Sequence, residues 1–159
     1  MSHPTLGLPP PDLSVGRAAA TRLRAASDRL TGRALEIAIA IDPTLAERND
    51  DVELRRFRRD LETYLERVAL SVAANDPSFA SQWAEWLAPS YRRRHVPMDD
   101  LVTLAEGLRG AISSVLAPNE RPSAEAALDA AIAVLRWHRR LAGDARPRNR
   151  ILAALYRGA

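Results

Sequence analysis

The 159-residue sequence predicts an all-α protein with six or seven helices, packed as a compact or orthogonal helical bundle. Apolar residues recur at intervals of three and four along most of the chain, which is the period of an amphipathic helix. Sustained alternation of apolar and polar residues is absent, and alanine and leucine dominate over β-branched runs. A chain of this length suits one domain with one hydrophobic core.

Composition divides the chain into three parts. Residues 1–11 are rich in proline and glycine and have no helical period, so we expect a flexible N-terminal arm. Residues 12–142 carry the helical stripes and form the single helical domain. We expect residues 143–159 to be a basic linker that leads into a short C-terminal helix over residues 151–156.

The first helical region runs from Asp12 or Ser14, either of which can cap it, to about Leu30. Thr31 and Gly32 predict a break, after which residues 34–41 form a short helix that is apolar nearly all round and therefore buried. A strand is the competing interpretation of residues 37–41, but the sequence offers no second strand to pair with it. Residues 44–50 are a polar connector.

The clearest helix covers residues 52–74, with Asp50 or Asp51 as its cap. Residues 77–118 then predict two amphipathic helices joined by a tight basic corner, which Pro97 ends on its far side. The first of these two helices contains Pro89, which predicts a kink or a break. Residues 124–141 form the next helix, with Ser123 as its cap.

Two groups of residues are candidate sites. Aromatic residues on the facing stripes of two helices predict a ligand pocket between them; they are Phe57, Tyr64, Trp83, Trp86 and Tyr91. The basic corner predicts a surface for an anion or an acidic partner, made by Arg92, Arg93, Arg94 and His95. We also expect a homodimer, and apolar area left exposed on the alanine-rich first helix would mark its interface.

Catalytic and metal motifs are not found in the sequence. The chain has no cysteine, so it has no thiolate nucleophile and no cysteine-ligated metal. The three histidines, His3, His95 and His138, do not form an i, i+4 metal pair, and no glycine-rich phosphate loop occurs. We therefore expect no enzymatic activity and no cofactor.

The charge pattern argues against two classes of partner. All 23 basic residues are arginine, but 20 carboxylates leave a net charge of only +3, which makes nucleic acid an unfavourable partner. The longest apolar run is far shorter than the roughly 20 residues that a membrane span needs. The N-terminus has no basic start followed by an apolar run, so the sequence predicts a cytoplasmic protein without membrane contact.

Residues 86–104, WLAPSYRRRHVPMDDLVTL, resemble the corner in the N-terminal sensory domains of the RsbT co-antagonist family of stressosome proteins. The resemblance covers about residues 30–142 and implies a globin-like fold that has lost haem, usually dimeric, with a regulatory protein partner. Haem-binding relatives of that fold carry a histidine where this chain has Tyr91, and His95 comes one turn later, so the resemblance implies no iron ligation.

Our hypothesis from the sequence is a non-catalytic sensory or regulatory module that acts through protein–protein interaction or binds a small apolar ligand in a helical pocket. A haem- or tetrapyrrole-binding globin-like protein that uses His95 or His138 is the first alternative. A nucleic-acid-binding regulator is the second, and a scaffold that docks through its proline-rich N-terminus is the third.

Overall fold

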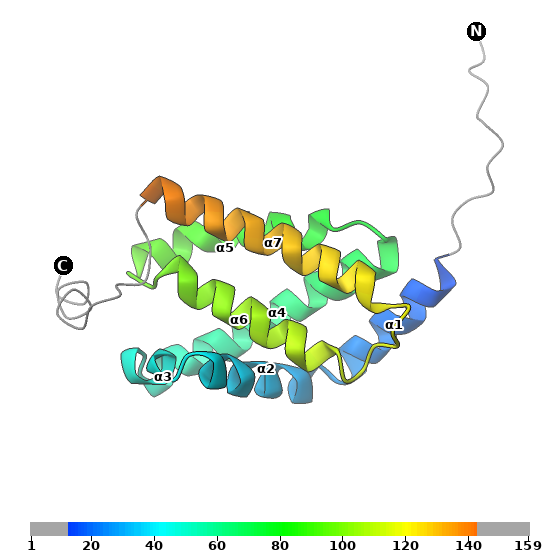
Figure 1. The fold of residues 1–159 in the computed structure, drawn as a ribbon, viewed down its shortest axis with the longest axis horizontal. Coiled ribbons are helices and arrows are strands. Elements are labelled where there is room, and N and C mark those ends of the chain that lie inside the picture. Colours follow the sequence, from blue (N-terminus) through cyan, green and yellow to red (C-terminus); the bar gives the residue numbers. More distant parts are fainter. Residues whose placement is uncertain (1–12, 143–159) are drawn as a thin grey trace, which may run out of the picture.

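Seven α-helices and no strand occur in residues 13–142, the part of the chain that the computed structural model describes (Figure 1). This confirms the all-α prediction. In chain order the helices are α1 (Ser14–Ala25), α2 (Ser27–Ile41), α3 (Thr44–Arg48), α4 (Asp51–Ala74), α5 (Ser78–Arg93), α6 (Met98–Ile112) and α7 (Arg121–Ala142). The N-terminal arm, the basic linker and the helix expected over residues 151–156 lie outside the described residues.

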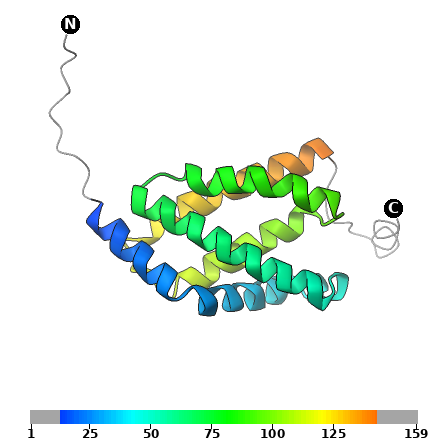
Figure 2. The same cartoon turned by 180° about the vertical axis from the view of Figure 1, so that it is seen from behind.

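The long helices form two layers, with α6 and α7 on one side and α4 and α5 on the other (Figures 1 and 2). The most extensive contacts are between α2 and α6, between α5 and α7, and between α1 and α4. The side chains between these helices make one apolar core, to which all seven helices contribute. Within residues 13–142, no helix combines the length and the apolar composition needed to cross a bilayer.

The first two helices meet at Ala26, so the break predicted at Thr31 and Gly32 is misplaced. Thr31 is fully buried inside α2, and its hydroxyl donates to the Ser27 carbonyl 3.0 Å away. Packing of Leu30, Ala34 and Ala38 into the core holds α2 helical through Gly32 and outweighs the low helix propensity of glycine. On the alanine-rich first helix, α4 covers Ala19, Ala20 and Leu23, whereas Val15 is 49% exposed.

Helix α4 begins and ends as its sequence predicts. The Asp50 carboxylate accepts a hydrogen bond from the Glu53 backbone N–H at 2.7 Å, which is an N-cap contact. At the other end Asn75 takes a left-handed conformation with φ 52°, and the Asp76 N–H returns to the Ser71 carbonyl at 2.9 Å. These two contacts fix the length of the helix that forms one wall of the candidate site.

Several smaller boundaries differ from the predictions. The expected connector contains α3, α5 continues through Pro89, and α7 begins at Arg121 because residues 117–120 already form its turn.

The close contact of α2 with α6 depends on Gly107, where an added Cβ would lie 2.3 Å from the Ala34 carbonyl oxygen. Glycine therefore sets how closely these two helices approach.

Candidate functional site

A small apolar cavity lies between α4, α5, α6 and α7. Its volume is about 20 Å³, which is room for one water-sized molecule. The four elements supply its lining, which consists of Phe57, Asp60, Leu61, Tyr64, Trp83, Ala84, Leu87, Tyr91, Leu101, Leu104 and Leu135. Four of the five residues predicted to make a ligand pocket are in this lining; Trp86 is the exception.

Aromatic stacking closes the inner part of the cavity. The rings of Phe57 and Tyr91 stack with centroids 5.8 Å apart and an interplanar angle of 26°, and both side chains are fully buried. The Tyr64 hydroxyl is buried with no hydrogen-bond partner among the described residues. Burial raises the pKa of the Tyr64 phenol well above its usual value, so this side chain stays neutral.

A polar group at the rim joins α4 to α5. The Tyr91 hydroxyl donates to the Asp60 carboxylate, and the Arg94 guanidinium lies 4.1 Å from the centroid of the Tyr91 ring. Arg94 also forms an ion pair with Glu53 of α4. Burial raises the pKa of Asp60, while the Tyr91 hydroxyl and the Arg94 charge oppose that rise. The rim thus offers a half-buried carboxylate beside an aromatic–arginine pair.

Two indole rings stand at the outer wall. Trp83 stacks on Trp86 with ring centroids 4.8 Å apart, and the Arg67 guanidinium of α4 lies 6.0 Å from the Trp83 ring. Trp86 is 68% exposed, so one face of the indole pair is open to solvent. The Trp83 Nε1–H is buried and has no hydrogen-bond partner among the described residues. An exposed indole supported from behind is a platform on which a flat conjugated ligand can stack.

The basic corner is a helix terminus rather than a free cluster of charges. His95 takes a left-handed conformation with φ 56°, and the Val96 N–H returns to the Tyr91 carbonyl at 3.1 Å. This is the Schellman arrangement that commonly ends a helix. Arg94 faces Glu53 and Tyr91, whereas the side chains of Arg93 and His95 are exposed. Arg94 of the predicted anion surface is therefore engaged within the fold, whereas Arg93 and His95 face solvent.

The histidines proposed as haem ligands do not line the cavity. The His138 Nε2 lies 2.7 Å from the Glu85 carboxylate, which joins α7 to α5, and the ring is only 8% exposed. His95 projects from the corner into solvent. Among the described residues, no group of three or more His, Asp or Glu side chains is arranged to hold a metal ion.

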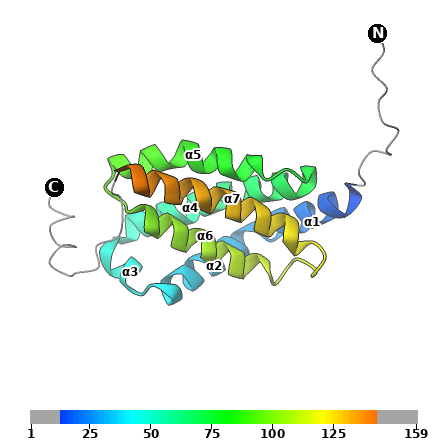
Figure 3. The same ribbon diagram turned by 45° about the horizontal axis from the view of Figure 1, so that its top comes forward.

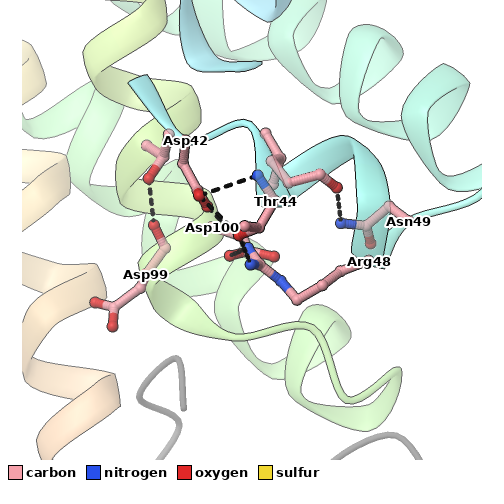
Figure 4. Close-up of polar contacts among 8 residues, drawn as sticks. Asp42, Thr44, Arg48, Asn49, Asp99 and Asp100 are labelled. Carbon is pink, nitrogen blue, oxygen red and sulfur yellow. Dashed lines mark hydrogen bonds and ion pairs between the residues drawn. The ribbon is translucent and has the colours of Figure 1, made fainter. Parts of the chain in front are cut away.

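A second polar cluster lies where α2, α3 and α6 meet (Figure 4). One Arg48 nitrogen lies 3.0 Å from the Asp42 carboxylate and 2.7 Å from the Asp100 carboxylate. The Asp42 carboxylate also accepts hydrogen bonds from the Thr44 N–H and hydroxyl at the start of α3. The three charged side chains are nearly buried, and the arginine stands between the two carboxylates, so the cluster is a structural ion-pair network.

Comparison with known proteins identifies the family. The phycobilisome protein family model matches residues 14–135, which covers six of the helices completely and most of α7. The chain belongs to the phycobilisome protein family. Members of this family share a globin-like helical fold, bind covalently linked bilin tetrapyrroles for light harvesting and assemble into oligomers. No match was found among curated proteins.

Family membership corrects two predictions from the sequence. The resemblance to the stressosome sensor domains is wrong, although the globin-like fold that it implied is confirmed. The sensory or regulatory function is also wrong, because phycobilisome proteins are light-harvesting proteins. The tetrapyrrole alternative agrees better with the family. The segment that carried the resemblance consists mostly of residues that end α5 and begin α6.

The residues present do not fit a covalently linked bilin. Proteins attach tetrapyrroles through cysteine thiols, as in c-type haem attachment, and this sequence has no cysteine. The cavity, at about 20 Å³, is also far below the roughly 300–1,000 Å³ of pockets that enclose drug-sized ligands. A pigment on this chain would have to be held without a covalent bond, and at the rim instead of inside.

Proposed function

We propose that this chain is a non-enzymatic member of the phycobilisome family that binds a tetrapyrrole non-covalently at the rim of the cavity, over α4 and α5. The observation that carries the proposal is the indole pair, in which Trp86 is 68% exposed and stacks on Trp83 at the outer wall of the cavity. A planar conjugated ligand gains buried apolar area and stacking energy on such a surface.

The polar groups around the indole pair complement the chemistry of a tetrapyrrole. Its propionate carboxylates suit the Arg67 guanidinium, which lies next to Trp83. Its pyrrole N–H groups are donors that suit the Asp60 carboxylate at the rim. When bound, the pigment supplies the absorption of visible light. No histidine lines the cavity, so the proposal is a metal-free tetrapyrrole held by stacking, hydrogen bonds and ion pairs.

Titration of the purified protein with biliverdin, an open-chain tetrapyrrole, tests this proposal. We expect a shift of the pigment absorption band and quenching of tryptophan fluorescence. We also expect full release of the pigment on denaturation in acidic urea. Trp86→Ala should weaken binding about tenfold or more, since stacked aromatic side chains are typical binding hot spots. Trp137→Ala is the matched control, because Trp137 is also exposed but lies on α7 outside the cavity lining.

Two results of this titration would contradict the proposal. One is the absence of binding at pigment concentrations of roughly 100 μM, which corresponds to an affinity too weak for a resident ligand. The other is equal binding by the wild type and Trp86→Ala, which would place the pigment elsewhere on the chain.

A second function is favoured by the small cavity and the missing thiol. In this function the chain binds no pigment and acts only as a subunit of an oligomer, the kind of assembly that is typical of its family. The same titration separates the two, since a pigment-free subunit binds no biliverdin but still self-associates. The nucleic-acid alternative has no comparable support, because arginines such as Arg24, Arg48 and Arg109 are already paired with carboxylates.

A further inference from the structure

Helix α7 presents an apolar stripe to solvent. It lies on the outside of the bundle against α5 and α6, with its buried face turned toward them (Figures 1 and 3). On the opposite face Trp137 is 49% exposed and Leu141 is 63% exposed. The exposed Ala126 and Ala133 and the half-buried Ala130 continue the same stripe toward the N-terminal end of the helix, at spacings of three and four residues. Large exposed apolar side chains in a continuous stripe mark an interaction surface.

Charged residues follow one flank of this stripe and change sign halfway along the helix. Glu125 and Asp129 lie in the first half, one turn apart, and Arg136 and Arg140 lie in the second half with the same spacing. Among the described residues, Glu125, Arg136 and Arg140 form no ion pair. Asp129 forms one with Arg109, and its side chain is still 68% exposed. The helix dipole explains the sign of each half but not why all four side chains share the flank next to Trp137.

We propose that α7 pairs with α7 of a second copy of this chain in an antiparallel, two-fold symmetric dimer. A two-fold axis perpendicular to the helix keeps the same flank on the same side of both copies and reverses the order of residues. With the axis between residues 132 and 133, Glu125 faces Arg140 of the second copy and Asp129 faces Arg136 of the second copy. All four ion pairs of the interface therefore form at once.

The apolar stripe fits the same register. Trp137 falls at the level of residue 128 of the second copy, between the small side chains of Ala126 and Ala130. The indole thus meets a shallow part of the facing helix, and the same contact occurs twice by symmetry. A parallel two-fold pairing would instead put the charged flanks on opposite sides of the interface, where these ion pairs cannot form. The charge pattern therefore selects a second copy in the antiparallel orientation.

This dimer does not depend on pigment binding, since Trp86 and Trp83 lie on α5 and take no part in it. Contact along a single helix puts the interface at the small end of specific interfaces, below roughly 1,200 Å². We expect a reversible dimer that weakens as salt screens the ion pairs.

Sedimentation equilibrium of the full-length protein, over a range of protein and salt concentrations, measures the association. Trp137→Ala should raise the dissociation constant roughly thirtyfold, the effect of a typical aromatic hot spot. Ile41→Ala is the matched control, because Ile41 is another large exposed apolar residue, at 56%, that lies at the end of α2 away from α7 and should leave the association unchanged. Circular dichroism should give wild-type helix content for both variants, since each residue is exposed.

Charge reversal tests the register. Arg136→Glu with Arg140→Glu makes the flank wholly acidic, and Glu125→Arg with Asp129→Arg makes it wholly basic, so each double variant alone should be monomeric. An equimolar mixture of the two should form a heterodimer. The variant with all four changes exchanges the two halves and should dimerise as the wild type does. A monomeric wild type, or a double variant that still dimerises on its own, would overturn the proposal.

Discussion

The Tyr91 hydroxyl donates a hydrogen bond to the Asp60 carboxylate and so ties α5 to α4 at the rim of the cavity. Tyr91 is fully buried, and its ring lies between Phe57 and the Arg94 guanidinium. The bond therefore fixes the position of the aromatic side chain that closes the site. Its loss would leave a half-buried carboxylate without its donor.

Tyr91→Phe removes only this hydroxyl, and we expect it to lower the free energy of unfolding by about 1–2 kcal/mol, since a buried acceptor loses its partner. Tyr64→Phe is the matched control, because the Tyr64 hydroxyl has no partner among the described residues and its removal should cost almost nothing. Urea denaturation of both variants measures the difference. Equal effects of the two substitutions would show that the Tyr91–Asp60 bond does not stabilise the fold.

The raised pKa of Asp60 makes the stability of the protein depend on pH. Burial is the main cause of the rise, so the folded state binds a proton more tightly at Asp60 than the unfolded state does. The stabilisation from this proton is complete below the unfolded pKa, near 3.9, and is lost as the pH rises through the folded pKa. Asp60→Asn keeps an acceptor without the charge, so its stability relative to the wild type should improve as the pH rises above the unfolded pKa.

Asp76 offers a control of opposite sign for this experiment. The Ser78 backbone N–H donates to the Asp76 carboxylate at 2.9 Å, and this bond lowers the pKa of Asp76. Its stabilisation is present above the unfolded pKa and is lost as the pH falls. Asp76→Asn should therefore become less stable relative to the wild type as the pH rises. Urea denaturation at several pH values measures the stability of each variant relative to the wild type. This difference should change with pH in opposite directions for the two variants.

Gly107 sets the distance between α2 and α6, so Gly107→Ala should be strongly destabilising. The added Cβ would lie 2.3 Å from the Ala34 carbonyl oxygen and 3.1 Å from the Ala38 Cβ, and forcing the helices apart should cost about 1–3 kcal/mol or more. Gly32→Ala is the matched control in α2, where the nearest atom is a guanidinium nitrogen 3.9 Å away. That change should stabilise the helix by about 0.5–1 kcal/mol. Thermal unfolding would separate the two directions clearly.

Much of the fold follows from periodicity. The stripe through Phe57, Leu61, Tyr64 and Leu65 is long enough to define α4, and Asp50 supplies the N-cap that the sequence suggests. The break in the first helical region was misplaced because the low helix propensity of Gly32 predicted it there. Packing of α2 into the core keeps this residue helical. The left-handed conformation of His95 could not be predicted either, since glycine usually occupies that position of a Schellman motif.

The candidate site was only partly predictable. Trp83 and Trp86 are three residues apart and were predicted to share one apolar stripe, yet Trp86 is 68% exposed. The buried face of α5 is centred on Ala84, Leu87 and Ala88, and a separation of three residues turns Trp86 away from it. Sequence spacing alone does not say which edge of a broad stripe faces solvent. Asp60 was missed because nothing in the sequence distinguishes it from the other carboxylates on α4. Only the structure shows that Tyr91 lies beside it.

The buried network around Arg48 gives the last prediction. Arg48 and Asp100 have side-chain exposures of 13% and 1%, and the guanidinium lies between Asp100 and Asp42 (Figure 4). Arg48→Met keeps the apolar stem but leaves two nearly buried carboxylates facing each other, which should cost about 3–5 kcal/mol. Arg33→Met is the control, because the Arg33–Glu36 pair is 63% and 67% exposed and should contribute less than about 0.5 kcal/mol. If urea denaturation gave the two variants the same stability, the network would not hold α3 against α6. If instead Arg48→Met with Asp100→Asn recovered most of the loss, the cost would be that of the unpaired buried charge and not of lost packing.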